Sequence, residues 1–142
     1  WLHSRLISRN VAEHLALDEA GIRQLVADCH AWFGKRALPP PSLYVPPAWA
    51  MGPIDLASLQ ELPFRYYETL SGTYDADADQ FVRTPLLGFE ADTRFRAMSL
   101  RLFNLINRGI ARLRGQVRLA IHPRDFELLL ASDLQVHLDK CG

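Results

Sequence analysis

The sequence has neither an excess of one sign of charge nor a long apolar run, and both absences narrow the range of functions to consider. Lys plus Arg and Asp plus Glu each number 16 in 142 residues, so the formal net charge is zero. A balanced charge gives no reason to expect a nucleic acid or another polyanion as the partner of the whole chain. No apolar run approaches the roughly 20 residues that span a bilayer, so we expect no membrane span.

Cysteine is also scarce. Cys29 and Cys141 are the only two, and they show neither a C-x-x-C spacing nor a zinc-ribbon pattern. This favours two free thiols in a reducing compartment, and therefore slightly favours the cytoplasm. No signal peptide is recognisable in a chain that starts at Trp1, and a periplasmic or secreted location stays open.

The short motifs of common enzyme classes are missing. The sequence holds no glycine-rich phosphate or dinucleotide loop, no G-x-S-x-G and no H-E-x-x-H. Asp75, Asp77 and Asp79 alternate as in a calcium loop, but its sixth-position glycine and twelfth-position glutamate are absent. We therefore expect residues 70–80 to form a solvated polar loop.

What is present is an alternation of strand and helix patterns. Apolar periodicity predicts helices over 15–33, 55–63 and 93–113, and one broken helix or two short ones over 125–141. It predicts strands over 43–45, 64–69 and 117–122, and a short strand and turn over 81–89. The segment 43–69 reads as strand–helix–strand, which is typical of a parallel sheet with a crossover helix. The predicted fold class is therefore α/β.

The predicted helix 93–113 is amphipathic. Met98, Leu102, Leu105, Ile106 and Leu113 mark one face, and five arginines lie largely on other faces. We expect these arginines to form a solvated face. The alternative is that they contact an anionic partner.

A histidine stands at the end of the stretch "RLAIHPRDF", Arg118 to Phe126. Pro123 cannot donate to a sheet ladder, so the strand ends near His122 and places an imidazole at its carboxyl end. In α/β folds this edge usually carries the chemistry, although a structural histidine is the alternative. Asp125 is expected to cap the following helix, and could instead orient an imidazole. The remaining helix histidines, His14, His30 and His137, are expected to be structural.

Three stretches in this order carry a resemblance: "LYVPPAWAMG", "LASLQELPFRYYET" and "LAIHPRDFE". They resemble the C-terminal half of polysaccharide deacetylase-like proteins of the NodB-homology, carbohydrate-esterase type, in its DUF2334-like branch. The resemblance implies a distorted (β/α) barrel and a metal-dependent hydrolase that removes acetyl groups from N-acetylated saccharides. It also implies that residues 1–142 are a single domain, the C-terminal part of such a barrel without its N-terminal strands.

The resemblance further assigns roles to individual residues. His3 corresponds to the second histidine of a metal-binding His-Gly-aromatic-x-His stretch, and the metal implied is divalent, zinc above all. Its other ligands, an aspartate and a first histidine, are expected upstream of Trp1. His122 corresponds to the general acid. Because those ligands are missing here, we expect the 142-residue chain alone to be inactive.

The loop after the strand 43–45 corresponds to the family's substrate-binding loop. Pro46, Pro47 and Trp49 match it, and the indole of Trp49 could stack on a sugar face. The alternative is that Trp49 covers the edge of the core. Val45 stands where the family has an arginine that orients the catalytic base. This departure favours the alternative of a non-catalytic carbohydrate-binding or regulatory relative, and an interaction module that uses the arginine-bearing helix is a third hypothesis.

Overall fold

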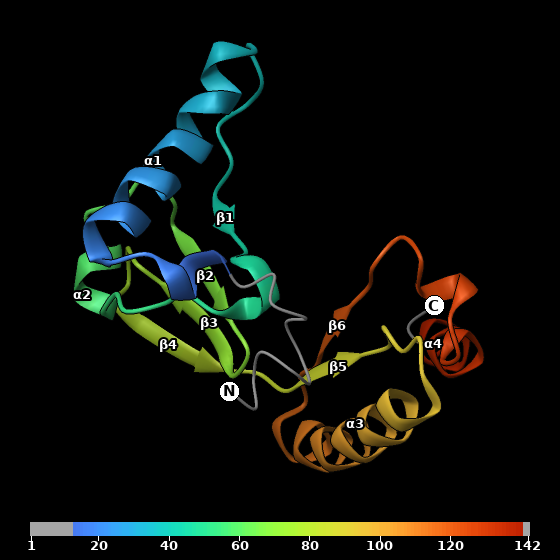
Figure 1. Cartoon of the computed structure of the whole chain (residues 1–142). Coiled ribbons are helices and arrows are strands. Elements are labelled where there is room, and N and C mark those ends of the chain that lie inside the picture. Colours follow the sequence, from blue (N-terminus) through green and yellow to red (C-terminus); the bar gives the residue numbers. More distant parts are fainter. Residues whose placement is uncertain (1–12, 141–142) are drawn as a thin grey trace. The chain divides into compact units, whose positions relative to one another are not determined.

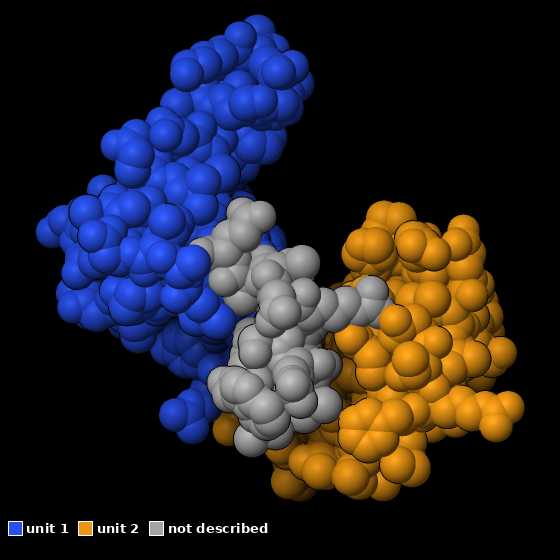
Figure 2. Space-filling view, in the orientation of Figure 1, with its two compact units in different colours: residues 1–83 blue, residues 84–142 orange. Residues whose placement is uncertain are grey.

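The computed structural model describes residues 13–140. The chain divides into two compact units, Trp1–Arg83 and Thr84–Gly142, which Figure 2 colours separately. The single domain expected over 1–142 stays a prediction. No helix among the described residues is long and apolar enough to cross a membrane.

The first unit combines one long helix with a four-stranded sheet (Figure 1). Its elements are η2 (Glu13–Ala16), α1 (Glu19–Lys35), β1 (Leu43–Tyr44), η3 (Pro47–Trp49), α2 (Leu56–Leu59), β2 (Tyr66–Thr69), β3 (Gly72–Asp75) and β4 (Gln80–Arg83). The sheet order is β1-β2-β3-β4, with β1 parallel to β2 and the other pairs antiparallel. The predicted parallel strand–helix–strand unit is confirmed.

The prediction of a polar loop over 70–80 is wrong, because this segment contributes β3 and the start of β4. Tyr74 lies between two half-buried residues of β3 and pairs with Tyr67 of β2, and both tyrosines are buried. The Asp75 carboxylate accepts hydrogen bonds from the backbone N–H groups of Asp77 and Ala78. The aspartate series therefore closes a hairpin turn, which is a common use of Asp side chains.

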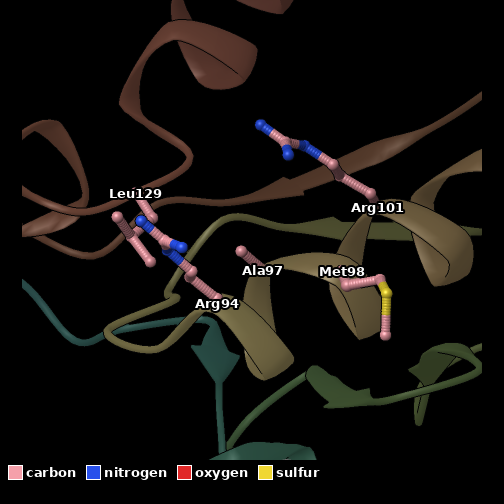
Figure 3. A pocket seen from close by; sticks show the side chains of 5 residues that line it. All are labelled: Arg94, Ala97, Met98, Arg101 and Leu129. Atoms are coloured by element: carbon pink, nitrogen blue, oxygen red, sulfur yellow. The ribbon is translucent and has the colours of Figure 1, made fainter.

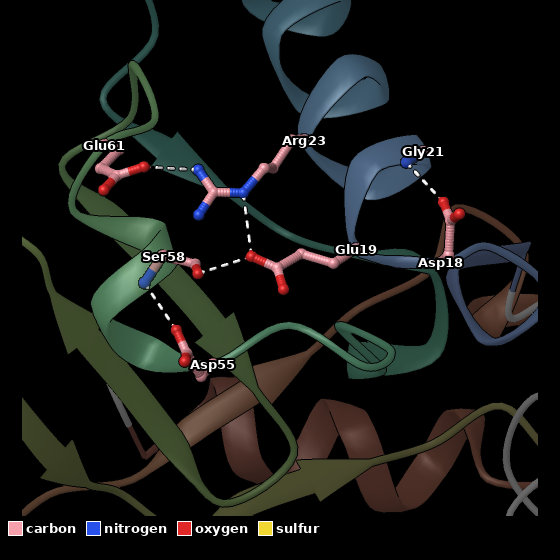
Figure 4. Close-up of polar contacts among 7 residues, drawn as sticks. All are labelled: Asp18, Glu19, Gly21, Arg23, Asp55, Ser58 and Glu61. Atoms are coloured by element: carbon pink, nitrogen blue, oxygen red, sulfur yellow. Dashed lines mark hydrogen bonds and ion pairs between the residues drawn. The ribbon is translucent and has the colours of Figure 1, made fainter.

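A polar network joins the beginnings of α1 and α2 (Figure 4). The Asp18 carboxylate accepts from the Gly21 N–H at 2.8 Å, so α1 begins at Glu19 and not at residue 15 as predicted. Glu19 accepts from the Ser58 hydroxyl at 2.7 Å, and Asp55 accepts from the Ser58 N–H at 2.7 Å. The hydrogen bonds from Ser58 lower the pKa values of the Glu19 and Asp55 carboxyls.

The second unit is a strand–helix–strand unit followed by short helices. It contains β5 (Leu86–Gly88), α3 (Arg94–Arg114), β6 (Arg118–Ala120), η4 (Asp125–Glu127) and α4 (Ala131–Leu138). β5 and β6 are parallel. Thr93 caps the start of α3, and Gly115, with φ of +70°, ends it, so the helix lies within one residue of the predicted range 93–113 at each end. The core of this unit combines β5 with α4 through Leu87, Leu130 and Leu134.

Asparagines fix α3 to β5. The Asn104 side chain donates to the Gly88 carbonyl at 2.8 Å and accepts from the Gly88 N–H at 3.1 Å. Asn107 donates to the Leu86 carbonyl at 2.9 Å. Because these amides face the strand, the apolar stripe of α3 lies on another side of the helix.

That apolar stripe is exposed. Amphipathic helices usually turn such a stripe toward the core. In α3 seven large apolar side chains are 39% to 89% exposed: Phe95, Met98, Leu102, Leu105, Ile106, Ile110 and Leu113. Leu100, on another side of the helix, packs against the core. The buried positions of the helix are instead Ala97 and Asn104.

The mixed α/β class predicted from the sequence is confirmed. Both units contain a parallel strand pair linked through a helix, which is the repeating element of (β/α) barrels. The strands in the described part of the chain form two separate sheets and no closed barrel. Membership of a barrel therefore stays a proposal.

Candidate functional site

His122 lies just beyond the carboxyl end of β6, in a chain segment held by a buried carboxylate. Its backbone N–H donates to Asp125 Oδ2 at 2.8 Å, and its exposed ring accepts from the Arg124 N–H through Nδ1 at 3.3 Å. Since Nδ1 is an acceptor, the neutral ring carries its proton on Nε2. Nε2 is therefore the ring atom available to a ligand.

Asp125 is 1% exposed, so its side chain holds the His122 segment from the interior of the second unit. The prediction that it caps the following helix is wrong: Arg124 is the cap residue of η4, and no side-chain hydrogen bond caps that helix. The carboxylate reaches backwards instead, to the His122 N–H. Its other oxygen, Oδ1, is buried and has no hydrogen-bond partner among residues 13–140.

The loop predicted to bind substrate is a strained turn in the first unit. Ala48 and Trp49 have φ values of 51° and 55°, in the left-handed region that non-glycine residues rarely occupy. The Trp49 N–H donates to the Pro46 carbonyl at 2.9 Å and closes the turn. Pro46 is buried, whereas Pro47 and Trp49 are half-buried. Strain of this kind costs about 1–3 kcal/mol per residue and gathers at functional sites.

The predicted site residues fall in different parts of the chain. Pro46, Pro47 and Trp49 belong to the first unit and His122 to the second. His3 lies outside the described residues. The structure fixes each residue within its own unit, and the catalytic and substrate-binding roles assigned to them stay predictions.

The residues that the structure describes do not fit a metal site by themselves. Within 13–140 no group of three or more His, Cys, Asp or Glu side chains could hold a metal ion. The helix histidines have structural contacts, as predicted. His14 Nε2 lies 2.8 Å from the Tyr44 hydroxyl, His30 packs edge-on to Phe64, and His137 Nδ1 lies 2.8 Å from a backbone carbonyl.

One surface feature was missed from the sequence. A pocket of about 430 Å³ lies beside the first half of α3 (Figure 3), lined by Arg94, Ala97, Met98, Arg101 and Leu129. The heptad spacing of the two arginines was visible in the sequence. The contribution of Leu129 was not, since it depends on the packing of the segment before α4.

No family model, no curated protein and no solved structure matches the chain. The likeness to polysaccharide deacetylases therefore rests on the three stretches quoted above.

Proposed function

We propose that the chain is part of a metal-dependent hydrolase of the polysaccharide deacetylase type, which removes acetyl groups from an N-acetylated saccharide. The observation that carries the proposal is the position of His122. It is exposed directly after a parallel strand, and the buried Asp125 holds its backbone. The carboxyl ends of parallel strands are the usual place for catalytic groups in α/β folds.

His122 is proposed as the proton donor. When the amide C–N bond of the substrate breaks, the sugar nitrogen leaves as an amine and needs a proton. Imidazoles titrate close to neutral pH and serve this role in many enzymes. As the proton donor the ring must be an imidazolium, with a proton on both nitrogens, so the hydrogen bond from the Arg124 N–H to Nδ1 has to open in this state. The imidazolium gives its Nε2 proton to the leaving amine and becomes a neutral ring.

Trp49 and Pro47 are proposed to bind the saccharide. Both are half-buried, so part of each surface is open to a ligand. Aromatic faces suit the apolar side of a pyranose ring. The buried Pro46 would act indirectly, by holding the turn through its carbonyl.

A divalent metal, with zinc as the candidate, belongs to this proposal through the resemblance alone. His3 is the proposed ligand from this chain. The described residues do not complete a site, so the steps proposed above use only His122 and the binding loop.

A non-catalytic carbohydrate-binding or regulatory relative is the second candidate. Val45 favours it: this exposed side chain directly follows β1, where the family has an arginine. An alkyl side chain cannot form an ion pair with a catalytic carboxylate. A carboxylate base that the family's arginine orients would therefore lose this orientation where Val45 replaces the arginine.

Acetate release from N-acetylglucosamine oligomers tests the proposal, measured on the longest encoded form of the protein with divalent metal added. His122→Ala should lower turnover by about 100-fold or more while the fold is retained. His30→Ala, which removes a helix histidine of the first unit, is the matched control and should keep turnover. Equal turnover in H122A and wild type contradicts the role of His122. Oligomer binding without turnover in either form supports the non-catalytic alternative.

A further inference from the structure

We propose that the exposed apolar face of α3 binds an amphipathic helix of another protein, one that carries a row of acidic residues. The face consists of the side chains Phe95, Met98, Leu102, Leu105, Ile106, Ile110 and Leu113, called the α3 face below. The proposal uses none of the residues assigned to hydrolysis and stands apart from that function.

The α3 face is continuous along the helix. At about 100° per residue, its members fall within an arc of about 140°, and a helix of 21 residues is about 31 Å long. Leu113, at the end, is 89% exposed, and Leu105, near the middle, is 65% exposed. An exposed apolar stripe of this length is typical of a surface that a partner covers.

The charge of α3 specifies the chemistry of the partner. The helix contains six arginines and no Asp or Glu. Arg94, Arg101 and Arg108 recur every seven residues, so they form one row along an edge of the α3 face. Within residues 13–140, Arg94 and Arg108 form no ion pair, whereas Arg101 contacts Asp133 at 2.9 Å. Rows of charge at heptad spacing select partner helices that carry the opposite charge at the same spacing.

The pocket favours a protein over a lipid surface. Two arginines, Arg94 and Arg101, line this pocket together with the apolar side chains of Ala97, Met98 and Leu129. Figure 3 shows Ala97 between the two arginines and Leu129 beside Arg94. A pocket of about 430 Å³ accepts a projecting apolar side chain, with acidic neighbours beside the two guanidinium groups. A bilayer presents no such projecting group.

A second copy of the chain is a poorer match. Because α3 has no acidic residue, two α3 faces packed together would bring arginine rows close to each other without compensation. Juxtaposed like charges oppose association. An acidic amphipathic helix satisfies both the apolar face and the arginine row.

Two synthetic helices of 21 residues test the proposal. Both carry leucines on one face; one carries Glu and the other Lys at three positions seven residues apart along its edge. Binding to the 142-residue chain is measured by fluorescence anisotropy at low and high salt. The Glu peptide should bind at least tenfold more tightly than the Lys peptide at low salt, and the difference should shrink at high salt.

Variants identify the surface. The double variant R94E/R108E should weaken binding of the Glu peptide about tenfold, and L102S/L105S should weaken it by at least as much. The matched control R36E/R124E makes the same change of charge at two arginines outside α3 and should bind like the wild type. Circular dichroism shows whether each variant keeps its helices, which is expected because none of the changed side chains is buried.

Three results overturn the proposal. Equal binding of the two peptides, or no binding of either, removes the acidic helix as the partner. Binding confined to vesicles of phosphatidylglycerol and phosphatidylcholine assigns the α3 face to a membrane surface. A dimer of the wild-type chain that L102S/L105S converts to monomer assigns the face to self-association.

Discussion

The amide of Asn104 should be the most sensitive polar group in the second unit. In Asn104→Ala the Gly88 N–H and carbonyl both lose their partner, at 3.1 and 2.8 Å in the native fold. A lost hydrogen bond costs about 1 kcal/mol net, and a backbone group left unpaired and partly buried costs about 1–3 kcal/mol. We expect a loss of about 2–4 kcal/mol in the free energy of unfolding.

A loss of this size is large for a small unit. At about 0.05–0.15 kcal/mol per residue, residues 84–142 would have a total stability of about 3–9 kcal/mol. N104A should therefore remove a large share of the stability of the second unit, and all of it at the low end of this range. Asn107→Ala removes a single hydrogen bond, to the Leu86 carbonyl, and should cost about 1 kcal/mol.

The distribution of aromatic residues provides the assay. Every Trp and Tyr of the chain lies within residues 1–83, so their fluorescence reports on the first unit. Urea unfolding is followed by this fluorescence and by circular dichroism at 222 nm, which sums the helices of both units and has its largest contribution from α3. N104A should lower the midpoint seen by circular dichroism.

The comparison with N107A decides whether the reasoning holds. If N104A is no more destabilising than N107A, the paired hydrogen bonds to Gly88 do not hold α3 to β5 as described. Hydrogen exchange at the Gly88 N–H gives an independent check, because this amide should lose its protection in N104A and keep it in N107A.

Two further perturbations test the first unit and the candidate site. Hydrogen bonds lower the pKa values of Glu19 and Asp55 in the folded protein. These two carboxylates therefore stabilise the folded state fully above their ordinary pKa values of 4.5 and 3.8. This stabilisation is lost as the pH falls through the lower pKa values of the folded state. The double variant E19Q/D55N should flatten this acid limb in tryptophan fluorescence; an unchanged limb would show that other carboxyls control it. Asp125→Ala should cost about 1.5–3 kcal/mol and speed exchange of the His122 N–H. Glu127→Ala, an exposed neighbour, should stay within about 0.5 kcal/mol, and equal effects of the two changes would refute the anchoring role of Asp125.

Local signals predicted much of the second unit. Thr93 and Gly115 mark both ends of α3 because a capping hydroxyl and a left-handed glycine act within one turn of the chain. The strand before His122 was predicted over 117–122 and forms as β6, which ends at Ala120, so His122 lies two residues past its carboxyl end. These features depend on neighbouring residues and not on the tertiary fold.

Features that depend on tertiary contacts were missed. The periodicity of α3 shows which residues share a face, but the asparagine contacts with β5 decide which face packs. The β3 strand was hidden because Asp75 looks like a loop residue, while its carboxylate closes the hairpin. No feature of the sequence predicts the left-handed turn at Ala48 and Trp49, because glycine is the residue that commonly marks such a conformation.

The contacts of Asn104 and Asn107 also determine which edge of the two-stranded sheet of β5 and β6 can pair with a further strand. In a strand, successive residues turn their backbone groups to opposite edges, so Leu86 and Gly88 share the edge that faces away from β6. Side-chain amides occupy the Leu86 carbonyl and both polar groups of Gly88 there. An incoming strand at this edge would have to displace three hydrogen bonds. Any further strand that extends this sheet, from a larger barrel or from another molecule, should therefore add next to β6.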